Sequence, residues 1–214
     1  MNPPPFLVGS DAIARYYGCM PMPIVQSLST PRLTLRPFVP TDRDMLLTLQ
    51  GDPEVMRYYG NGEALAPAQI DLVLEAHVHF REKSYWAWAI SLKDDPTCIG
   101  QVTAGVVDRS GEQWIELCWL LVPGRWRKGY GSEAVKGVID HGIANLGWQK
   151  IMASSDLRNE ASLRLMSKCG LAYTREEMGS HGRMVRVHTL EHLPDNQNPV
   201  YPIPPIPEVV AAMD

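Results

Sequence analysis

Hydrophobic and polar residues alternate with a period of two in several stretches of this chain, which is the pattern of strands in a sheet. Residues 32–36 alternate two leucines with polar side chains, and residues 86–92 place large apolar side chains at every second position. Residues 98–107 and 113–122 form two more runs, and the turn residues at 108–111 predict that they pair as a hairpin. The last run is largely apolar, which predicts burial on both faces.

Apolar residues recur at helical spacing between these strands. The predicted helical segments are 40–49, 67–83, 131–146 and 160–169. Pro67 suits a first helical turn, whereas Gly147 and Gly170 suit positions just past a helix end. A short strand at 149–154 and two more before about residue 193 complete the order β-α-α-β-β-β-α-β-α-β-β. We therefore predict a mixed α/β (α+β) fold around one sheet.

Prolines are concentrated at both ends of the chain. Residues 1–30 contain five prolines and are expected to form an N-terminal extension that packs loosely or wraps the domain. Residues 194–214 form a proline-rich tail, in which 202–207 favours the polyproline II conformation. We interpret this tail as lying on the surface, with a P-x-x-P ligand for a partner as the alternative. The domain itself is predicted to span residues 31–193.

Composition narrows the classes of function. The chain has 214 residues, of which 45% are hydrophobic and 21% charged, as in one ordinary globular domain. Its formal net charge of -4 argues against a nucleic-acid-binding protein, which would need a basic surface. The N-terminus does not resemble a signal peptide, no apolar run is long enough for a membrane span, and the four cysteines are widely spaced. We therefore expect a cytoplasmic protein with reduced, mostly buried thiols, no membrane or nucleic-acid partner, and the capacity to form a homodimer.

The most informative segment is the loop at 126–131 together with the helix that follows it. Two glycines and the cations Arg127 and Lys128 lie directly before this helix. The first N–H groups of a helix lack internal partners and carry partial positive charge. Glycine lets a phosphate approach the main chain closely. These residues therefore predict a phosphate-binding turn.

Two general phosphate-binding patterns fit this turn only in part. The Walker A pattern fits residues 124–129 but fails at Tyr130, where its lysine belongs. The dinucleotide pattern G-x-G-x-x-[GA] fits residues 129–134, and Asp156 lies near the position of a ribose-binding carboxylate. Its first glycine, however, lies several residues beyond the preceding strand. An NAD(P)-dependent oxidoreductase therefore stays open as an alternative.

A third pattern fits better. Residues 126–131 resemble the pyrophosphate loop [QR]-x-x-G-x-[GA] of the GNAT N-acetyltransferase superfamily, with Trp at the first position. That departure resembles the branch of ribosomal-protein N-terminal acetyltransferases, and so do the segments 32–37, 52–56 and 159–171. The resemblance covers about residues 29–190. It implies a GNAT-like, mostly antiparallel central sheet flanked by helices on both faces.

The resemblance also implies how acetyl-CoA would bind as a co-substrate. Main-chain N–H groups would hold its pyrophosphate, its pantetheine arm would pair with a strand, and Asn159 would hydrogen-bond that arm. The main-chain groups belong to Arg127, Lys128, Gly129, Tyr130, Gly131 and Ser132 in the turn, and to Leu120, Leu121 and Val122 in the strand. A plain helix cap is the other interpretation of Asn159.

Acetyl transfer to an amine needs a base for the amine and an acid for the departing thiolate. Glu116 is a lone carboxylate in an apolar strand, which is costly unless it is paired, hydrated or functional, and we predict it as the base. The tyrosine that many GNAT members use as the acid corresponds to Met166, which cannot donate a proton. The resemblance therefore places the acid at Ser162, and a purely structural first-turn serine is the alternative.

The predicted function is transfer of an acetyl group from acetyl-CoA to a primary amine of a small molecule or a protein N-terminus. Direct attack in a ternary complex is expected, although Cys118 shares a strand face with Glu116 and leaves a covalent route open. A non-catalytic acyl-CoA-binding module is a further alternative. Met56, Tyr58 and Tyr59 are candidates for setting acceptor specificity.

Other conspicuous residues have plainer interpretations. His77 and His79 are expected to be solvated on a surface helix. His188 and His192 lack a third ligand, so no metal is predicted. The two tryptophans of the 86–92 strand are expected in the core rather than in a substrate site.

Overall fold

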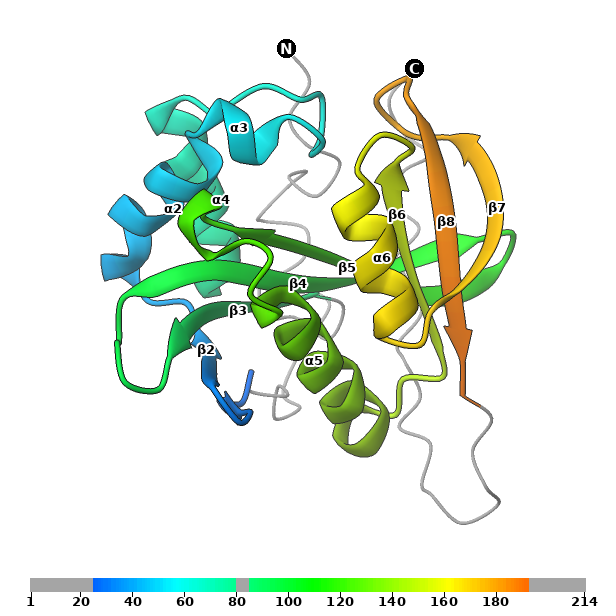
Figure 1. Cartoon of the computed structure of the whole chain (residues 1–214), viewed down its shortest axis with the longest axis horizontal. Helices are drawn as coiled ribbons and strands as arrows, with labels where there is room; N and C mark the ends of the chain where they lie inside the picture. The colour runs from blue at the N-terminus through cyan, green and yellow to red at the C-terminus, as the bar shows by residue number, and fades with distance from the viewer. Residues whose placement is uncertain (1–24, 80–84, 193–214) are drawn as a thin grey trace, which may run out of the picture.

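The computed structural model describes residues 25–79 and 85–192; Cys19 and the proline-rich tail from residue 194 lie outside these ranges. The chain folds around one eight-stranded sheet with the strand order β1-β2-β3-β4-β5-β6-β8-β7 (Figure 1). The strands are β1 (Leu28–Ser29), β2 (Leu33–Pro37), β3 (Tyr85–Leu92), β4 (Cys98–Arg109), β5 (Glu112–Leu121), β6 (Lys150–Asp156), β7 (Ala172–Met178) and β8 (Met184–Glu191).

Helices connect the strands in the predicted order. They are η1 (Pro40–Asp42), α2 (Arg43–Gln50), α3 (Pro53–Met56), α4 (Pro67–His79), η2 (Pro123–Arg125), α5 (Tyr130–Leu146) and α6 (Glu160–Lys168). The short strand β1 and the short helix α3 are additions to that order. All neighbouring strands pair antiparallel except β5 and β6, which are parallel because the crossover helix α5 joins them. The predicted fold class is therefore confirmed.

Helices cover both faces of the sheet. Helices α5 and α6 pack on one face in the main core cluster, to which β3 contributes Trp86 and Trp88. Helices α2 and α4 pack on the other face, where Ile70 meets Ala87 and Ala89. Because side chains alternate along a strand, β3 presents its tryptophans to one layer and its alanines to the other. Both tryptophans are buried, which confirms that they belong to the core.

Two predictions about burial are wrong. Strand β5 is not buried on both faces. Buried residues are interspersed with half-buried ones along the strand, and one part of the strand lines a cleft. His77 is not solvated: it is 7% exposed, its Nδ1 lies 3.1 Å from the hydroxyl of Tyr85, and its ring packs on Phe38. Burial lowers the pKa of His77 to about 4, so the imidazole is neutral at pH 7. His79 is exposed, as predicted.

Other features of the described residues bear on the class of protein. Across 25–79 and 85–192, no helix is both long and apolar enough to cross a membrane. Within the same ranges, no group of three His, Cys, Asp or Glu side chains is placed to hold a metal ion. Cys98, Cys118 and Cys169 are free thiols, of which Cys169 is buried and the other two half-buried.

Candidate active site

Strands β5 and β6 pair at one end and then separate. Their parallel register consists of two residue pairs, Ile115 with Ile151 and Glu116 with Met152. Beyond these pairs β6 continues to pair with β8, while residues 117–121 of β5 pair, in the part of the chain that the structure describes, only with β4. The main-chain edge of β5 is therefore available to an extended ligand that adds as another strand.

The chain leaves β5 through η2 and makes a tight turn before α5. Arg127 and Gly129 have left-handed backbone conformations, with φ of 59° and 81°. Gly129 is the N-cap residue of α5, and no side chain of the described chain caps this end. Glu133 donates the first intrahelical bond, to the carbonyl of Gly129, so the N–H groups of residues 130–132 have no helical partner. This is the geometry of an anion-binding turn.

The side chains of the turn divide into anchors and exposed cations. The indole Nε1 of Trp126 donates to the carbonyl of Leu121 at 2.6 Å and fixes the loop to the end of β5. Lys128 Nζ donates to the carbonyl of Gly124 at 3.0 Å, and Arg127 is exposed. The Trp that departs from the usual loop pattern therefore has a definite structural role.

Arg32 supports the turn from the N-terminal side of the domain. Its guanidinium donates to the carbonyl of Lys128 at 3.0 Å and lies 4.5 Å above the ring of Tyr130. Its Nε pairs with the Glu133 carboxylate at 2.6 Å, and the same carboxylate accepts from the hydroxyl of Thr30. Sequence reasoning assigned no role to Arg32 or Glu133, because their contact joins residues about a hundred positions apart.

The second half of helix α6 packs beside the first turn of α5. Gly131 is buried at this contact, where an added Cβ would lie 2.8 Å from a methyl group of Leu165. The thiol of Cys169 donates to the carbonyl of Ser132 at 3.5 Å. Of the predicted turn residues, Gly131 and Ser132 therefore also position the two helices.

A cleft of about 70 Å³ lies where β5 and β6 separate. Four parts of the chain line it: the end of α3 with the loop after it, strand β5, strand β6 and the start of α6. The lining residues are Val55, Tyr58, Tyr59, Leu117, Cys118, Trp119, Leu120, Ser154, Ser155, Asn159 and Ser162. The structure thus brings Tyr58 and Tyr59 together with Asn159 and Ser162. Met56 instead lies in a buried cluster with Leu120.

Glu116 lies at the point where β5 and β6 separate. The hydroxyl of Ser154, which lines the cleft, donates to Glu116 Oε1 at 3.4 Å. Burial raises the pKa of Glu116, and the positive charge of Arg109 opposes the shift only in part. A carboxylate with a raised pKa is a better proton acceptor near neutral pH. Sequence reasoning missed Ser154, since a lone serine in a strand gives no signal of its own.

The remaining polar groups of the cleft are neutral. Asn159 Oδ1 accepts the Ser162 N–H at 3.2 Å, so Asn159 does cap α6. Burial, with the neighbouring charge of Glu116, raises the pKa of Cys118 to about 12. Burial, Cys118 and Tyr85 raise the pKa of Tyr59 well above its usual value. Both groups are therefore protonated at neutral pH. The sequence indicated Tyr59 only as a specificity residue and did not reveal it as a possible proton donor.

The features expected of a dinucleotide site are weak here. Asp156, which was considered for a ribose, is 5% exposed and is held by Arg158 at 2.6 Å. In the described chain the sheet contains one parallel pairing, whereas a dinucleotide fold needs a series of parallel strands.

Comparisons with known proteins agree with this geometry. The family described as "Acetyltransferase (GNAT) domain" matches residues 32–172. The chain is 31% identical over 145 residues to YoaA of Bacillus subtilis (strain 168), named as an uncharacterized N-acetyltransferase, with 67% of this chain and 81% of YoaA covered.

Solved structures share the fold at low sequence identity. Spermidine N-acetyltransferase from Vibrio cholerae, in complex with CoA and spermine, has a TM-score of 0.63 at 16% identity, over 74% of this chain and 95% of that one. RimL, a ribosomal-protein alpha-N-acetyltransferase in complex with coenzyme A, has a TM-score of 0.66 at 10% identity, over 78% and 98%. By its family match and its curated relative, the chain belongs to the GNAT acetyltransferase family.

Proposed function

We propose that this protein transfers an acetyl group from acetyl-CoA to a primary amine. One observation carries the proposal: the open main-chain edge of β5 leads directly to the unpartnered N–H groups at the start of α5. A long ligand with an amide-containing arm and a pyrophosphate fits these two features together. CoA has this construction, and the neighbours of similar fold include CoA complexes.

The binding roles follow from the positions of the residues. The main chain of Leu120, Leu121 and Val122 pairs with the pantetheine arm, and the N–H groups from Arg127 to Ser132 hold the pyrophosphate. Arg127 and Lys128 are exposed at the turn and add positive charge there. Asn159 uses its oxygen to cap α6, which leaves its amide nitrogen to donate to the arm.

The proposed chemistry is a direct transfer with proton transfers at two atoms: the amine nitrogen loses protons, and the sulfur of the leaving thiolate gains one. Glu116 accepts the amine proton through Ser154 or a water molecule, because it does not itself line the cleft. The neutral amine attacks the thioester carbonyl, whose oxygen is stabilised by a main-chain N–H near Leu121. The C–S bond breaks, the acylated nitrogen loses its extra proton to water, and the leaving thiolate takes a proton that water supplies through the hydroxyl of Ser162, which stays neutral. A thiol with a pKa of about 12 is a poor nucleophile at pH 7, which argues against acyl transfer through Cys118.

The acceptor is proposed to be a small amine or a protein N-terminus. It enters from the side of Tyr58 and Tyr59, opposite the start of α6. The named neighbours act on, or hold, amines of both kinds. The cytoplasmic location and the division into extension, domain and tail stay predictions.

Two measurements test the proposal. Calorimetric titration of the full chain with acetyl-CoA and, separately, with NADH should give binding of acetyl-CoA alone, whereas binding of NADH alone would overturn it. Thiol release from acetyl-CoA is then measured with a panel of spermidine, small amines and peptides that begin with Ala or Ser. Amine-dependent release that is lost in Glu116→Gln supports an enzyme. Tight acetyl-CoA binding without release on any acceptor would instead indicate a binding module.

A further inference from the structure

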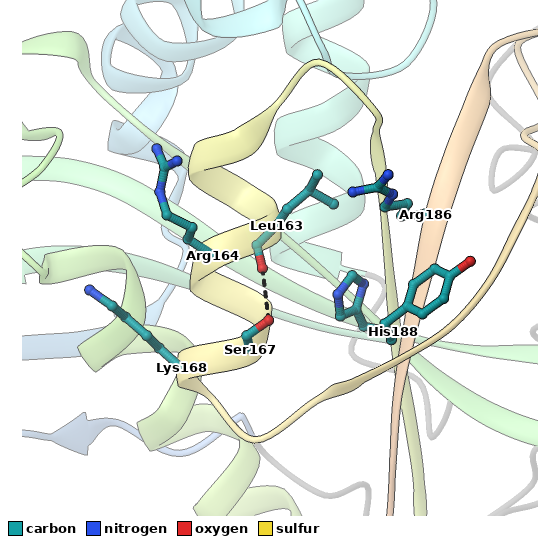
Figure 2. Close-up of a pocket in the computed structure, with 7 residues that line it drawn as sticks. Leu163, Arg164, Ser167, Lys168, Arg186 and His188 are labelled. Atoms are coloured by element: carbon teal, nitrogen blue, oxygen red, sulfur yellow. Dashed lines mark hydrogen bonds between the residues drawn. The ribbon is translucent and has the colours of Figure 1, made fainter.

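A second cavity lies on the other flank of α6, between this helix and strands β7 and β8 (Figure 2). It has a volume of about 600 Å³ and is lined by Leu163, Arg164, Ser167, Lys168, Tyr173, Arg186 and His188. None of these residues lines the acetyl-transfer cleft, which uses Asn159 and Ser162 of the same helix. The two cavities are therefore separate sites that share α6.

One part of this cavity is apolar and aromatic. Leu163 lines the cavity together with Tyr173 and His188, whose rings pack edge to face with 5.9 Å between their centroids. Tyr173 is 58% exposed, which leaves a large aromatic surface uncovered beside the cavity. An aromatic ligand that stacks here would bury this surface and would be stabilised by the removal of apolar area from water.

His188 adds an unsatisfied polar atom to this wall. The side chain is 4% exposed, and no described residue forms a hydrogen bond with its Nδ1. Burial and the charge of Arg186 lower the pKa of His188, so the ring is a neutral partner at pH 7. Buried nitrogen atoms are nearly always paired in folded proteins, so this one is available to pair with a ligand in the cavity.

The other part of the cavity is cationic. Arg186 and His188 project from β8 toward Leu163 and Ser167 of α6, as Figure 2 shows, whereas the charged ends of Arg164 and Lys168 point away from β8. Arg164 and Arg186 pair with the exposed carboxylates Glu160 and Glu176, each at 2.9 Å. Exposed ion pairs contribute little to stability, so Arg186 can turn from Glu176 to an incoming anion at little cost.

We propose that this cavity is a second ligand site that binds a small aromatic anion, with the ring between Leu163 and Tyr173 and the carboxylate or phosphate on Arg186. Both halves of the ligand are required. A ring without charge leaves the Arg186 guanidinium without an anionic partner, and an anion without a ring leaves the aromatic wall exposed to water.

The test is a titration of the full chain in saturating CoA, which keeps the pyrophosphate turn filled. The probes are phenyl phosphate, benzoate, inorganic phosphate and benzyl alcohol, followed by calorimetry and by NMR shifts of the labelled protein. Phenyl phosphate and benzoate should bind at least about tenfold more tightly than phosphate or benzyl alcohol. The largest shifts should come from α6, β7 and β8. Because the readout is binding, it does not depend on acetyl transfer.

Matched variants decide where the probe sits. Arg186→Gln should weaken the binding of phenyl phosphate about fivefold or more, whereas Lys168→Gln, whose charge points away from β8, should leave the affinity unchanged within about twofold. Arg175→Gln removes the same charge from β7 outside the cavity, where Arg175 pairs with Glu177, and should leave the affinity unchanged within about twofold. Equal binding of phosphate and phenyl phosphate, or equal effects of all three variants, would overturn the proposal. Binding of phenyl phosphate that is seen without CoA but is lost in saturating CoA would also overturn the proposal.

Discussion

The guanidinium of Arg32 and the carboxylate of Glu133 join the start of β2 to the first turn of α5, with 2.6 Å between Nε and Oε2. Burial opposes ionisation of Glu133, but hydrogen bonds from Thr30 and Arg32 outweigh it and leave its pKa below the usual value. A carboxylate in the first turn would repel a bound pyrophosphate if its charge were not compensated. Arg32 therefore both holds the turn, through the Lys128 carbonyl, and neutralises this charge.

The first prediction concerns this pair. Arg32→Ala should weaken CoA binding about tenfold, because it releases the turn and leaves Glu133 uncompensated. Glu133→Ala should weaken it less, since it removes the repulsion together with the anchor. Calorimetry at low and high salt measures both. Asp71→Asn, which breaks an exposed pair between α2 and α4, is the control and should have no effect. The opposite order of the two variants would contradict the charge argument.

Gly129 provides a second prediction, because its φ of 81° is strained for any residue with a side chain. Gly129→Ala should raise the Kd for CoA by about tenfold or more, as the turn relaxes to relieve the strain. An added Cβ would also lie 3.3 Å from the Arg32 guanidinium. Gly124→Ala is the matched control, since a Cβ added at Gly124 would have no atom of the described chain within 4 Å. Equal affinities for the two variants would show that the turn does not bind the pyrophosphate.

Glu116 provides a third prediction, in which activity and stability separate. Glu116→Gln should lower kcat by about 10²-fold or more while the Kd for CoA stays unchanged. The folded-state pKa of Glu116 is raised, so its stabilising contribution is present at low pH and is lost as the pH rises through that pKa. At pH 7 the glutamine variant should therefore unfold at the same temperature as the wild type or slightly higher.

The pH profile checks the same residue independently. The acidic limb of kcat/KM should follow the pKa of Glu116 in the wild type and disappear in the variant. Glu112→Gln on the same strand is the control, because Glu112 is exposed and paired with Lys150. A large loss of thermal stability in Glu116→Gln would instead indicate a structural role.

Sequence periodicity predicted the long elements of the fold and missed the short ones. Helices α5 and α6 and strands β3 to β5 follow the predicted segments because each buries a regular set of apolar positions. Strand β1 has two residues and α3 has four, which is too few for a period to appear. Helix α3 could have been found from its ends, since Asp52 caps it and Pro53 opens it.

The candidate site was predictable only where it is local in sequence. The turn before α5 could be read from residues 126–131, because a helix N-terminus and its glycine are adjacent along the chain. The separation of β5 from β6 could not be read, since pairing register depends on contacts between distant segments. The burial of His77 was missed for the same reason: Phe38 and Tyr85, which enclose it, come from other elements.

The proton donor for the leaving thiolate is the subject of a fourth prediction. Ser162 and Tyr59 both line the cleft and both carry a proton at neutral pH. If Ser162 is the donor, Ser162→Ala should lower kcat by about tenfold or more, and Tyr59→Phe should mainly raise KM for the acceptor. Thioesters with better leaving groups should rescue Ser162→Ala, because they need less proton transfer. A kcat defect confined to Tyr59→Phe would reassign the acid to Tyr59.

The two histidines of α4 allow a fifth prediction, about stability rather than catalysis. His77 is buried with a pKa of about 4, so the folded protein binds its proton less readily than the unfolded chain does. Its contribution to stability is therefore lost as the pH falls from about 6.5 toward 4, by as much as about 3 kcal/mol. Chemical denaturation at pH 7 and pH 4.5 should show a smaller drop for His77→Gln than for the wild type. His79→Gln, an exposed change two residues away, should match the wild type at both values. Parallel losses in all three proteins would mean that other groups, such as the Asp42 carboxylate held by Arg36, dominate acid unfolding.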